Sequence, residues 1–515
     1  MPLLIRTQFK TNSIHHPVSW GPIYSFSMAV SRASSSSVQN VAQLRMVSNI
    51  ITWFVPLRMV YLWRRNYSIK PNVMFKVHLE TLLQPERATL RKTRNALGLN
   101  TNGRRHQHRN PSDPSPEFFA SFLPDTETKG KRLVNLPEES GPLDQDGTYI
   151  VRGEWIQALE EDKGRKRSNV VLLYIHGGGH VFCSATFHRQ LVTRLTLKFG
   201  PGARAFVVDY RLSPEDPFPA AVHDIFASYL YLTQPEHHAI SSLHKRDQWD
   251  HPLEPVDPRD IVLAGDSAGG GLAIAFMLYM RDYVQPALST PLIVPSTTIL
   301  LSAWTDISTS MPAASGDHSY CYVPCPMAVS PFGDQSTFES FPRFNFARNY
   351  LCGDAKLSPN ERTQSKDLEW EWYRHLAQHP LVSPVYTANL RGINSHTILQ
   401  AGAFDRLVDD TKLYAYKLGQ ANPASRVRFE LYQEQVHVFQ FFEFLPMASK
   451  AMKSIVSFVD SAQEAVKSQD GQRARSRKTA AKGTEWVVVD YKGNEAERYE
   501  GTSVTELDRC WNQSR

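Results

Sequence analysis

The sequence predicts an α/β fold in which a doubly wound, mostly parallel sheet carries helices on both faces. Two observations predict it. Continuous apolar runs of strand length recur through the middle of the chain, as expected for strands buried on both faces of a parallel sheet. Helical stretches lie between several of these runs, and alternating strands and helices are typical of doubly wound sheets. We expect residues 148–467 to form this domain.

Six apolar runs are the predicted core strands, at residues 170–175, 205–208, 261–264, 298–301, 397–400 and 427–432. The predicted helices span residues 219–232, 267–283, 409–419 and 447–467. Two insertions interrupt the alternation. Residues 234–259 contain four histidines without the paired helical spacing of a metal site, which favours a solvated loop. Residues 308–345 lie between two core strands, where loops surround substrate sites, and are expected to shape a pocket.

The N-terminal region is basic, whereas the rest of the chain is not. Nine lysines and arginines precede the first acidic residue, Glu80, so residues 80–515 carry a net charge of −3 (+6 minus +9). The overall basicity therefore does not predict nucleic-acid binding. Residues 1–48 are acid-free and rich in Ser and Arg, which is typical of an organellar transit peptide or a disordered extension.

The segments that flank the predicted domain carry weaker signals. Residues 49–66 are apolar but interrupted by Pro56 and Arg58, and they are shorter than the roughly twenty apolar residues of a spanning helix. We expect this segment either to lie in a membrane interface as a weak anchor or to pack on the domain as part of a cap. Residues 67–147 are predicted as cap region and linker, and residues 468–515 as a basic, low-complexity tail that is disordered or forms an accessory edge.

The five cysteines are odd in number and scattered, so they do not form a disulfide framework and they fit a reducing compartment. With the leader, this favours an intracellular protein that is membrane-associated, for example at the endoplasmic reticulum, or targeted to an organelle. The Cys321 and Cys325 pair has no second matching pair, so neither a metal nor a cofactor is expected. No sequence feature indicates an oligomeric state.

A Gly-x-Ser-x-Gly sequence, GDSAG at residues 265–269, directly follows one predicted strand and opens a predicted helix. A strand–turn–helix of this kind lifts a serine out on a strained turn. The strained turn needs a glycine two residues before the serine and another two residues after it, because a Cβ at either position would collide with the neighbouring strand or helix. The dipole at the helix N-terminus favours the negative charge that develops during attack. Ser267 is therefore the predicted nucleophile.

Three consecutive glycines follow the predicted strand at 170–175, in the segment HGGG that begins at His176. Glycines cost chain entropy, so a run of them is expected where the backbone passes close to a reacting group and directs N–H donors at it. We predict an oxyanion hole from the backbone N–H groups of three residues, Gly178, Gly179 and Ala268. His176 and Gly177 complete the oxyanion-loop motif, and His176 is expected to orient the loop rather than to exchange protons.

A serine nucleophile of this kind needs an acid and then a histidine later in the chain. Asp405 follows the strand at 397–400 and is preferred over Asp409 and Asp410, which open the next helix as typical caps or dipole partners. His437 follows the strand at 427–432 by a short loop. We therefore predict a catalytic triad in which His437 takes the proton of Ser267 and Asp405 orients the imidazole.

Together these residues resemble the hormone-sensitive-lipase-like branch of the α/β hydrolases, the G-D-x-G lipolytic enzymes. The motifs that carry the resemblance are HGGG at 176–179, DYRLSPEDPFPAA at 209–221 with Asp224 beyond it, GDSAG at 265–269, SAWTD at 302–306, Ser383-Pro384 and the acid loop 405–409. The resemblance covers roughly residues 150–465. One departure is that His437 is followed by Val-Phe rather than by the commoner Gly-Phe.

The resemblance implies an α/β-hydrolase fold with an N-terminal cap, and structural roles for Arg211, Glu215 and Asp224. It also implies a carboxylesterase or lipase-like serine hydrolase that cleaves short- to medium-chain acyl or acetyl esters through an acyl-enzyme, with a small ester as its partner. An amidase, lactonase or deacetylase that uses the same triad stays open. A non-catalytic ligand-binding protein of this fold is disfavoured, because His437 is present.

Overall fold

The computed structural model describes residues 106–110, 149–157, 168–213, 215–233, 255–288, 291–308, 310–315, 321, 323, 346–352, 376–393, 396–423, 425–443, 445–471, 483–490, 492–496 and 508. The predicted leader 1–48, the apolar segment 49–66 and nearly all of the predicted cap and linker 67–147 lie outside the described residues. So do most of the two insertions at 234–259 and 308–345. Within the described ranges, every helix is too short or too polar to cross a bilayer.

A ten-stranded sheet runs through the described part of the chain, in the order β1-β2-β4-β3-β5-β6-β7-β8-β9-β10. All neighbours from β4 to β9 are parallel, whereas β1, β2 and β10 run antiparallel to their neighbours. The strands are β1 His106–Asn110, β2 Tyr149–Gln157, β3 Val171–Ile175, β4 Arg204–Val208, β5 Ile261–Asp266, β6 Thr297–Leu301, β7 His396–Gly402, β8 Arg426–Tyr432, β9 Thr484–Val489 and β10 Glu495–Ala496. All six predicted strands are present and differ from the prediction only at their ends.

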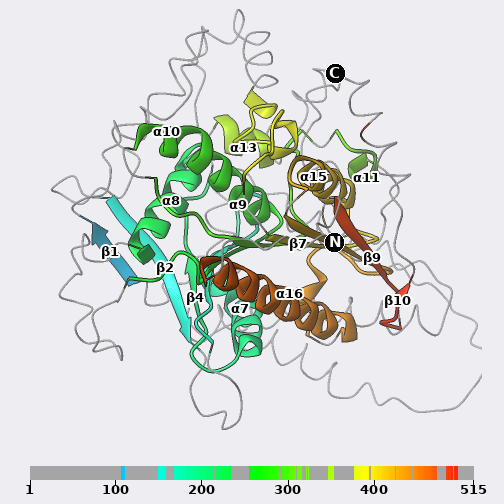
Figure 1. Cartoon of the computed structure of the whole chain (residues 1–515). Coiled ribbons are helices and arrows are strands. Elements are labelled where there is room, and N and C mark those ends of the chain that lie inside the picture. Colours follow the sequence, from blue (N-terminus) through cyan, green and yellow to red (C-terminus); the bar gives the residue numbers. More distant parts are fainter. Residues whose placement is uncertain are drawn as a thin grey trace, which may run out of the picture.

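Helices cover both faces of this sheet (Figure 1). On one face lie α7 (Ala185–Phe199) and α16 (Pro446–Gly471), and on the other lie α8 (Ala220–Thr233), α9 (Ala268–Tyr279) and α15 (Val408–Ala421). α9 continues as a π-helical turn, Met280–Val284, and α10 (Gln285–Ala287). Shorter helices are α11 (Pro312–Ser315), α13 (Phe346–Cys352) and the 3₁₀ turns Pro384–Tyr386 and Phe439–Phe441. The predicted doubly wound architecture is confirmed.

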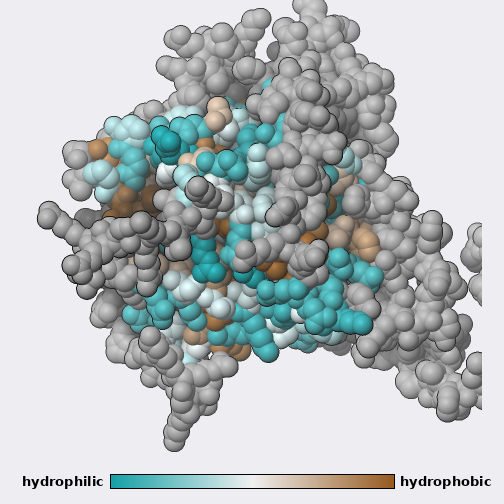
Figure 2. Space-filling model, turned by 45° about the vertical axis from the view of Figure 1, so that its right-hand side comes forward, coloured by the Kyte–Doolittle hydropathy of each residue, from teal (hydrophilic) through white to brown (hydrophobic). Residues whose placement is uncertain are grey.

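The continuous apolar runs are explained by the two covered faces. Along β3, Leu173 and Ile175 are buried in the cluster that includes α8 and α9, whereas Leu172 and Tyr174 are buried in the cluster that includes α7 and α16. Burial of each such side chain contributes about 1.5–3 kcal/mol. On the side shown in Figure 2, hydrophilic residues cover most of the lower described surface and apolar residues show as smaller patches. The apolar side chains are therefore mainly packed between the layers.

The sheet continues past residue 467, where the domain was predicted to end. The apolar run from Trp486 to Val489 lies in β9 (Thr484–Val489), which together with β10 adds an edge to the sheet, one of the two predictions for the tail. β9 pairs in parallel with β8 along its whole length, from Val427 beside Thr484 to Tyr432 beside Val489. Its pairing partner lies more than fifty residues earlier in the chain, so the run stands isolated in the sequence although it is integral to the sheet.

Candidate active site

Ser267 lies on a sharp turn between β5 and α9, with φ 52° and ψ −123°. These angles are strained for a residue with a side chain. The two flanking glycines make the turn sterically feasible. A Cβ on Gly265 would lie 2.5 Å from the carbonyl oxygen of Gly269, and a Cβ on Gly269 would lie 2.1 Å from that of Ile175 at the end of β3. The predicted reason for glycine at both positions is therefore visible in the structure.

The backbone of Ser267 is held on both sides. Its N–H donates to the carbonyl of Leu301 at the end of β6 (2.9 Å), and its carbonyl accepts from the N–H of Trp304 (2.8 Å). The same carbonyl accepts from Gly270 (3.1 Å) and Gly271 (3.2 Å) in the first turn of α9. These bonds offset the backbone strain and fix the serine at the helix N-terminus, where the helix dipole favours negative charge.

The glycine loop after β3 turns back toward the elbow. Gly178 has φ 119° and Gly179 has φ 62°, conformations that favour glycine. The carbonyl of Gly178 accepts hydrogen bonds from Val181 (3.1 Å) and Phe182 (2.8 Å). The N–H groups of Gly178 and Gly179 donate no hydrogen bond to any residue that the structure describes. Together with the N–H of Ala268 at the start of α9, they are donors that have no acceptor among the described residues.

Asp266 ties the glycine loop to the nucleophile. Its carboxylate is buried and accepts from the Gly177 N–H (3.1 Å) and the Tyr174 hydroxyl (2.8 Å), and it lies 3.3 Å from Nε2 of His188. Burial raises the pKa of Asp266, but the interactions with His188 and Tyr174 outweigh it, so the net pKa is lowered. A Cβ on Gly177 would lie 2.3 Å from this carboxylate. The residue before the nucleophile therefore fixes where the glycine loop runs.

His176 is part of the scaffold under the loop. Its Nδ1 lies 2.7 Å from the carbonyl oxygen of Gly177, and its ring stacks on Tyr210 with centroids 4.2 Å apart. The Tyr210 hydroxyl donates to the His176 carbonyl (2.8 Å). Burial, followed by the neighbouring His188, lowers the pKa of His176 to about 3. A fully buried imidazole that stays neutral agrees with the expected orienting role.

The acid and the histidine meet at the next two strand ends. Nδ1–H of His437 donates to Oδ1 of Asp405 (2.9 Å), and both side chains are buried. The same Oδ1 accepts from the Leu407 N–H (2.9 Å), which fixes the carboxylate against its own loop. Asp409 points elsewhere, because its Oδ2 accepts from the Ala313 N–H (2.9 Å). The structure thus pairs the imidazole with the aspartate that was preferred from the sequence.

Backbone hydrogen bonds join the two loops that carry these residues. The Ala403 N–H donates to the Tyr432 carbonyl and the Phe404 N–H donates to the Gln435 carbonyl, both at 2.9 Å. One described residue of the 308–345 insertion also lies beside the acid. Burial, followed by the negative charge of Asp405, raises the pKa of the Cys321 thiol to about 12. The described part of the insertion therefore reaches the acid loop, and its role in shaping a pocket stays a prediction.

The histidine loop is anchored to the same segment as the nucleophile. The N–H of Val438 donates to Oγ of Ser302 (3.0 Å), which directly follows Leu301, the residue that holds the Ser267 N–H. Val438 has φ 41°, in the left-handed region. A left-handed conformation favours glycine, which is the commoner residue after the histidine in the enzymes that the sequence resembles. Valine at this position therefore adopts a strained conformation. The nucleophile and the histidine loop are thus both fixed to the segment from Leu301 to Trp304 at the end of β6.

Two of these residues had no role in the sequence prediction. Asp266 stood inside the quoted GDSAG motif and Ser302 at the start of SAWTD, but a motif letter does not reveal which atoms its side chain will contact. Arg211 and Asp224, expected to be structural, form an ion pair with Nη2 and Oδ1 3.0 Å apart. Among the described residues, no cluster of three or more His, Cys, Asp or Glu is suited to hold a metal ion.

Comparison with known proteins agrees with this geometry. A family model described as alpha/beta hydrolase fold matches residues 172–331 and 325–441, which together span more than half of the chain. An esterase of Acinetobacter venetianus is 28% identical over 304 residues, covering 59% of this chain and 78% of the esterase. An acetyl-hydrolase of Streptomyces hygroscopicus is 28% identical over 310 residues, covering 60% of this chain and 79% of that protein.

A third relative and a solved structure carry the name of the resembled branch. The hormone-sensitive lipase of Bos taurus is 29% identical over 181 residues, which cover 34% of this chain and 22% of the lipase. The solved hormone-sensitive lipase from a metagenome library has 25% sequence identity and a TM-score of 0.42, covering 61% of this chain and 82% of that one. The chain belongs to the α/β hydrolase fold family and is a hydrolase.

Proposed function

We propose that this protein is a serine hydrolase of carboxylic esters, with Ser267 as nucleophile, His437 as general base and acid, and Asp405 as the residue that orients the imidazole. The observation that carries the proposal is the 2.9 Å contact between Nδ1 of His437 and Oδ1 of Asp405. These residues follow the carboxyl ends of parallel strands, as Ser267 does on its strained turn. The esterase and acetyl-hydrolase relatives support ester hydrolysis as the activity.

The first half of the reaction acylates the serine. Nε2 of His437 accepts the hydroxyl proton while Oγ of Ser267 forms a bond to the ester carbonyl carbon. Asp405 holds the Nδ1–H tautomer and stabilises the imidazolium that results. The tetrahedral intermediate then expels the alcohol, which takes the proton from His437. The second half repeats these steps with water, which releases the carboxylic acid and restores the serine.

The glycine loop supplies the electrostatic part of the mechanism. In the intermediate, the former carbonyl oxygen carries a negative charge that needs preorganised donors. The N–H groups of Gly178, Gly179 and Ala268 are the proposed donors, because the chain gives them no other acceptor in its described part. Loss of one such donor typically costs about 3–4 kcal/mol of transition-state stabilisation. Asp266 preserves this arrangement by holding the Gly177 N–H.

Short- to medium-chain acyl or acetyl esters are the proposed substrates. The acetyl-hydrolase relative supports the short end of this range. The same triad could cleave an amide, but an alcohol is a better leaving group than an amine. A lactone is a cyclic ester that also releases an alcohol, so lactone hydrolysis stays an alternative. A purely ligand-binding role would require neither the pairing of His437 with Asp405 nor the strained conformation of Ser267.

A hydrolysis profile tests this proposal. The full-length protein is assayed with p-nitrophenyl esters from acetate to palmitate, and kcat/KM is expected to be highest for short to medium chains. Comparable or greater turnover of the palmitate ester would contradict the substrate range. The matched control is Ser267→Ala, which removes only the hydroxyl. If this variant retained the activity of the unaltered protein, Ser267 would not be the nucleophile.

A further inference from the structure

The strand β9 lies outside residues 172–441, the part of the chain that the family model matches, yet it adjoins the loop that carries His437. We propose that β9 positions His437 for catalysis, so that this strand is a working part of the active site although it lies outside the proposed triad. This inference rests on the proposed function, because it assigns to β9 the support of the proposed general base.

The first support is a backbone bond at the start of the histidine loop. β8 and β9 stay in register up to Tyr432 beside Val489. One residue further on, the N–H of Gln433 donates to the carbonyl of Val489 (2.9 Å). The pairing therefore extends past the end of β8 into the turn that leads to His437. The direction in which the chain leaves the sheet is fixed by β9.

The second support is packing on both sides of the histidine. Val487 and Val489 are buried in one apolar cluster with Tyr432 and Phe439, and Val436 packs against that cluster. The rings of Tyr432 and Phe439 lie 4.8 Å apart. Val436 directly precedes His437, and Phe439 follows it by two residues. A shortened side chain in β9 would therefore leave space beneath the residues that flank the imidazole.

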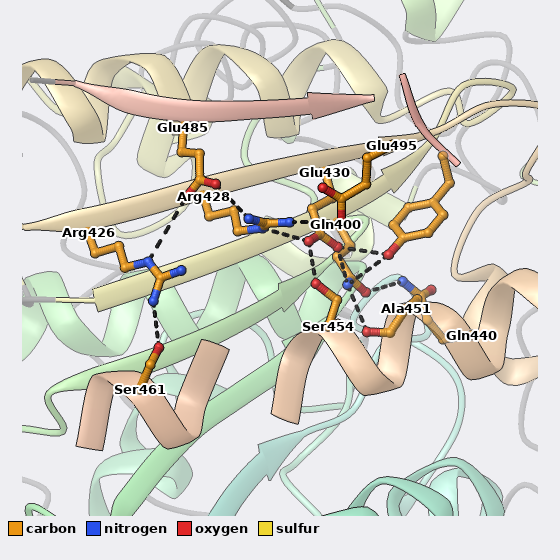
Figure 3. Close-up of polar contacts among 11 residues, drawn as sticks. Gln400, Arg426, Arg428, Glu430, Gln440, Ala451, Ser454, Ser461, Glu485 and Glu495 are labelled. Carbon is orange, nitrogen blue, oxygen red and sulfur yellow. Dashed lines mark hydrogen bonds and ion pairs between the residues drawn. The ribbon is translucent and has the colours of Figure 1, made fainter. Parts of the chain in front are cut away.

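The third support is a chain of polar contacts, drawn in Figure 3, that starts on β9 and ends three residues after His437. Glu485 of β9 accepts from Arg428 (2.6 Å), which also donates to Glu430 (2.7 Å), and both Arg428 and Glu430 lie on β8. Glu430 accepts from Gln400 of β7 (2.8 Å), and Oε1 of Gln400 accepts from Gln440 (3.0 Å). Glu430 and both glutamines are buried, so the contacts lie in a medium where they are strong.

The strained residue after the histidine explains why such support is needed. Val438 is β-branched and adopts φ 41°, a conformation that persists only where its surroundings hold it in place. Its N–H is fixed by Ser302 from the β6 side, and Arg194 donates to the carbonyls of Gln440 (2.7 Å) and Phe441 (2.9 Å) from α7. β9 supplies the contacts from the remaining side, through Tyr432 and Phe439.

The test compares two substitutions in β9 of the full-length protein. Val489→Ala removes packing beneath the histidine loop. Trp486→Leu is the matched control. Trp486 packs against Phe429 of β8, in the apolar cluster that includes α8 and α9, and not in the cluster of the histidine loop. For p-nitrophenyl acetate, we expect Val489→Ala to lower kcat roughly ten- to a hundredfold with KM nearly unchanged, since small misplacements of a catalytic group have effects of this size. The control is expected to keep kcat within about twofold.

Further variants make the outcome decisive. Val489→Ile, which keeps the branched side chain, is expected to retain the kcat of the unaltered protein. If Val489→Ala gives no folded protein, Val487→Ala replaces it in the same comparison. The proposal would be overturned if the valine-to-alanine variant and Trp486→Leu had the same kcat and lost the same amount of Tm. β9 would then be only a structural strand. If His437→Ala itself retained full turnover, the proposed function would fail, independently of β9.

Discussion

The nucleophile elbow and the histidine loop are both strained, but they are held in different ways. At the elbow, the glycines that permit φ 52° at Ser267 lie within two residues of it, and α9 supplies two of the stabilising hydrogen bonds in its own first turn. In the histidine loop, Val438 at φ 41° has no glycine beside it. Its supports come from β6, α7 and β9, which are far away in the sequence.

This difference has a consequence for catalysis. The nucleophile has local supports, namely its flanking glycines and the first turn of α9, in addition to its bonds with Leu301 and Trp304, so its position should be less sensitive to changes elsewhere in the molecule. The position of the base depends on tertiary contacts, and small losses of packing should reach it first. We therefore expect substitutions near the histidine loop to lower turnover in proteins that remain folded. Substitutions of the elbow glycines, whose Cβ atoms would meet backbone, are expected to affect folding itself.

The largest expected effect is at the elbow. Ser267→Ala should lower kcat on the order of 10⁶-fold, because no other group on the described sheet edge replaces the nucleophile. The free energy of unfolding should change by no more than about 1 kcal/mol, since a hydroxyl is removed without creating a large cavity. Steady-state kinetics and urea denaturation check both numbers. Substantial residual turnover in a pure preparation would remove Ser267 from its role.

The next effect separates the two aspartates of the acid loop. Asp405→Asn should lower kcat by about 10⁴-fold, because an amide can hold the imidazole in the wrong tautomer. Asp409→Asn is the matched control, since Asp409 contacts Ala313 and Lys412 instead of His437. It should cost only about 1 kcal/mol of stability and leave kcat nearly unchanged. Equal damage by both substitutions would show that the acid is misassigned.

A third effect concerns the free energy of unfolding at low pH, to which two buried histidines of the glycine loop contribute. Burial lowers the pKa values of His176 and His180 to about 3 in the folded protein, against about 6.5 when unfolded. Below pH 6.5 the unfolded state therefore binds more protons, and stability is lost as the pH falls. Each histidine should remove about 2 kcal/mol between pH 7.5 and pH 5.

One variant isolates this contribution. Asparagine tolerates the positive φ of residue 180, so His180→Asn should reduce the loss of stability between pH 7.5 and pH 5 by about 2 kcal/mol. The difference between variant and unaltered protein cancels other groups, such as Asp410, whose raised pKa acts in the opposite direction. Urea denaturation at the two pH values gives the result. An unchanged pH dependence would contradict the assignment of a buried, neutral His180.

The smallest expected effect is at the link between the two regions. Ser302→Ala removes the acceptor for the Val438 N–H and leaves that buried donor unpaired, at a cost of about 1–3 kcal/mol in stability. Turnover should fall roughly tenfold, with KM nearly unchanged, because the histidine loop loses its tie to the nucleophile. Ser308→Ala is a control, since Ser308 contacts Asp306 instead. A kcat loss as large in Ser308→Ala would mean that Ser302 has no specific role.

The same contrast explains how much could be predicted from the sequence. The elbow and the glycine loop are encoded in short runs, so Ser267, Gly178 and Gly179 could be proposed from spacing and strand position alone. Asp405 could be preferred over Asp409 because it lies nearer the strand end. The covered faces of the sheet make its strands continuous apolar runs, and for this reason all six were found.

The supports of the histidine loop could not be predicted in this way. Ser302 lies more than a hundred residues before Val438, and Val489 lies about fifty residues after it. The sequence predicts the tail only as disordered or as an accessory edge, because a low-complexity segment separates it from the domain. Nothing in the sequence of β8 indicates that β9 is its pairing partner. Contacts between distant residues depend on the folded arrangement, which neither composition nor periodicity records.

The most direct test of the account is to label the protein with a fluorophosphonate and locate the modified residue by mass spectrometry. We predict a single modification, on Ser267, and labelling of His437→Ala that is slower by more than about a hundredfold because the general base is missing. Modification of a different residue, or labelling of His437→Ala at the rate of the unaltered protein, would contradict the proposed triad.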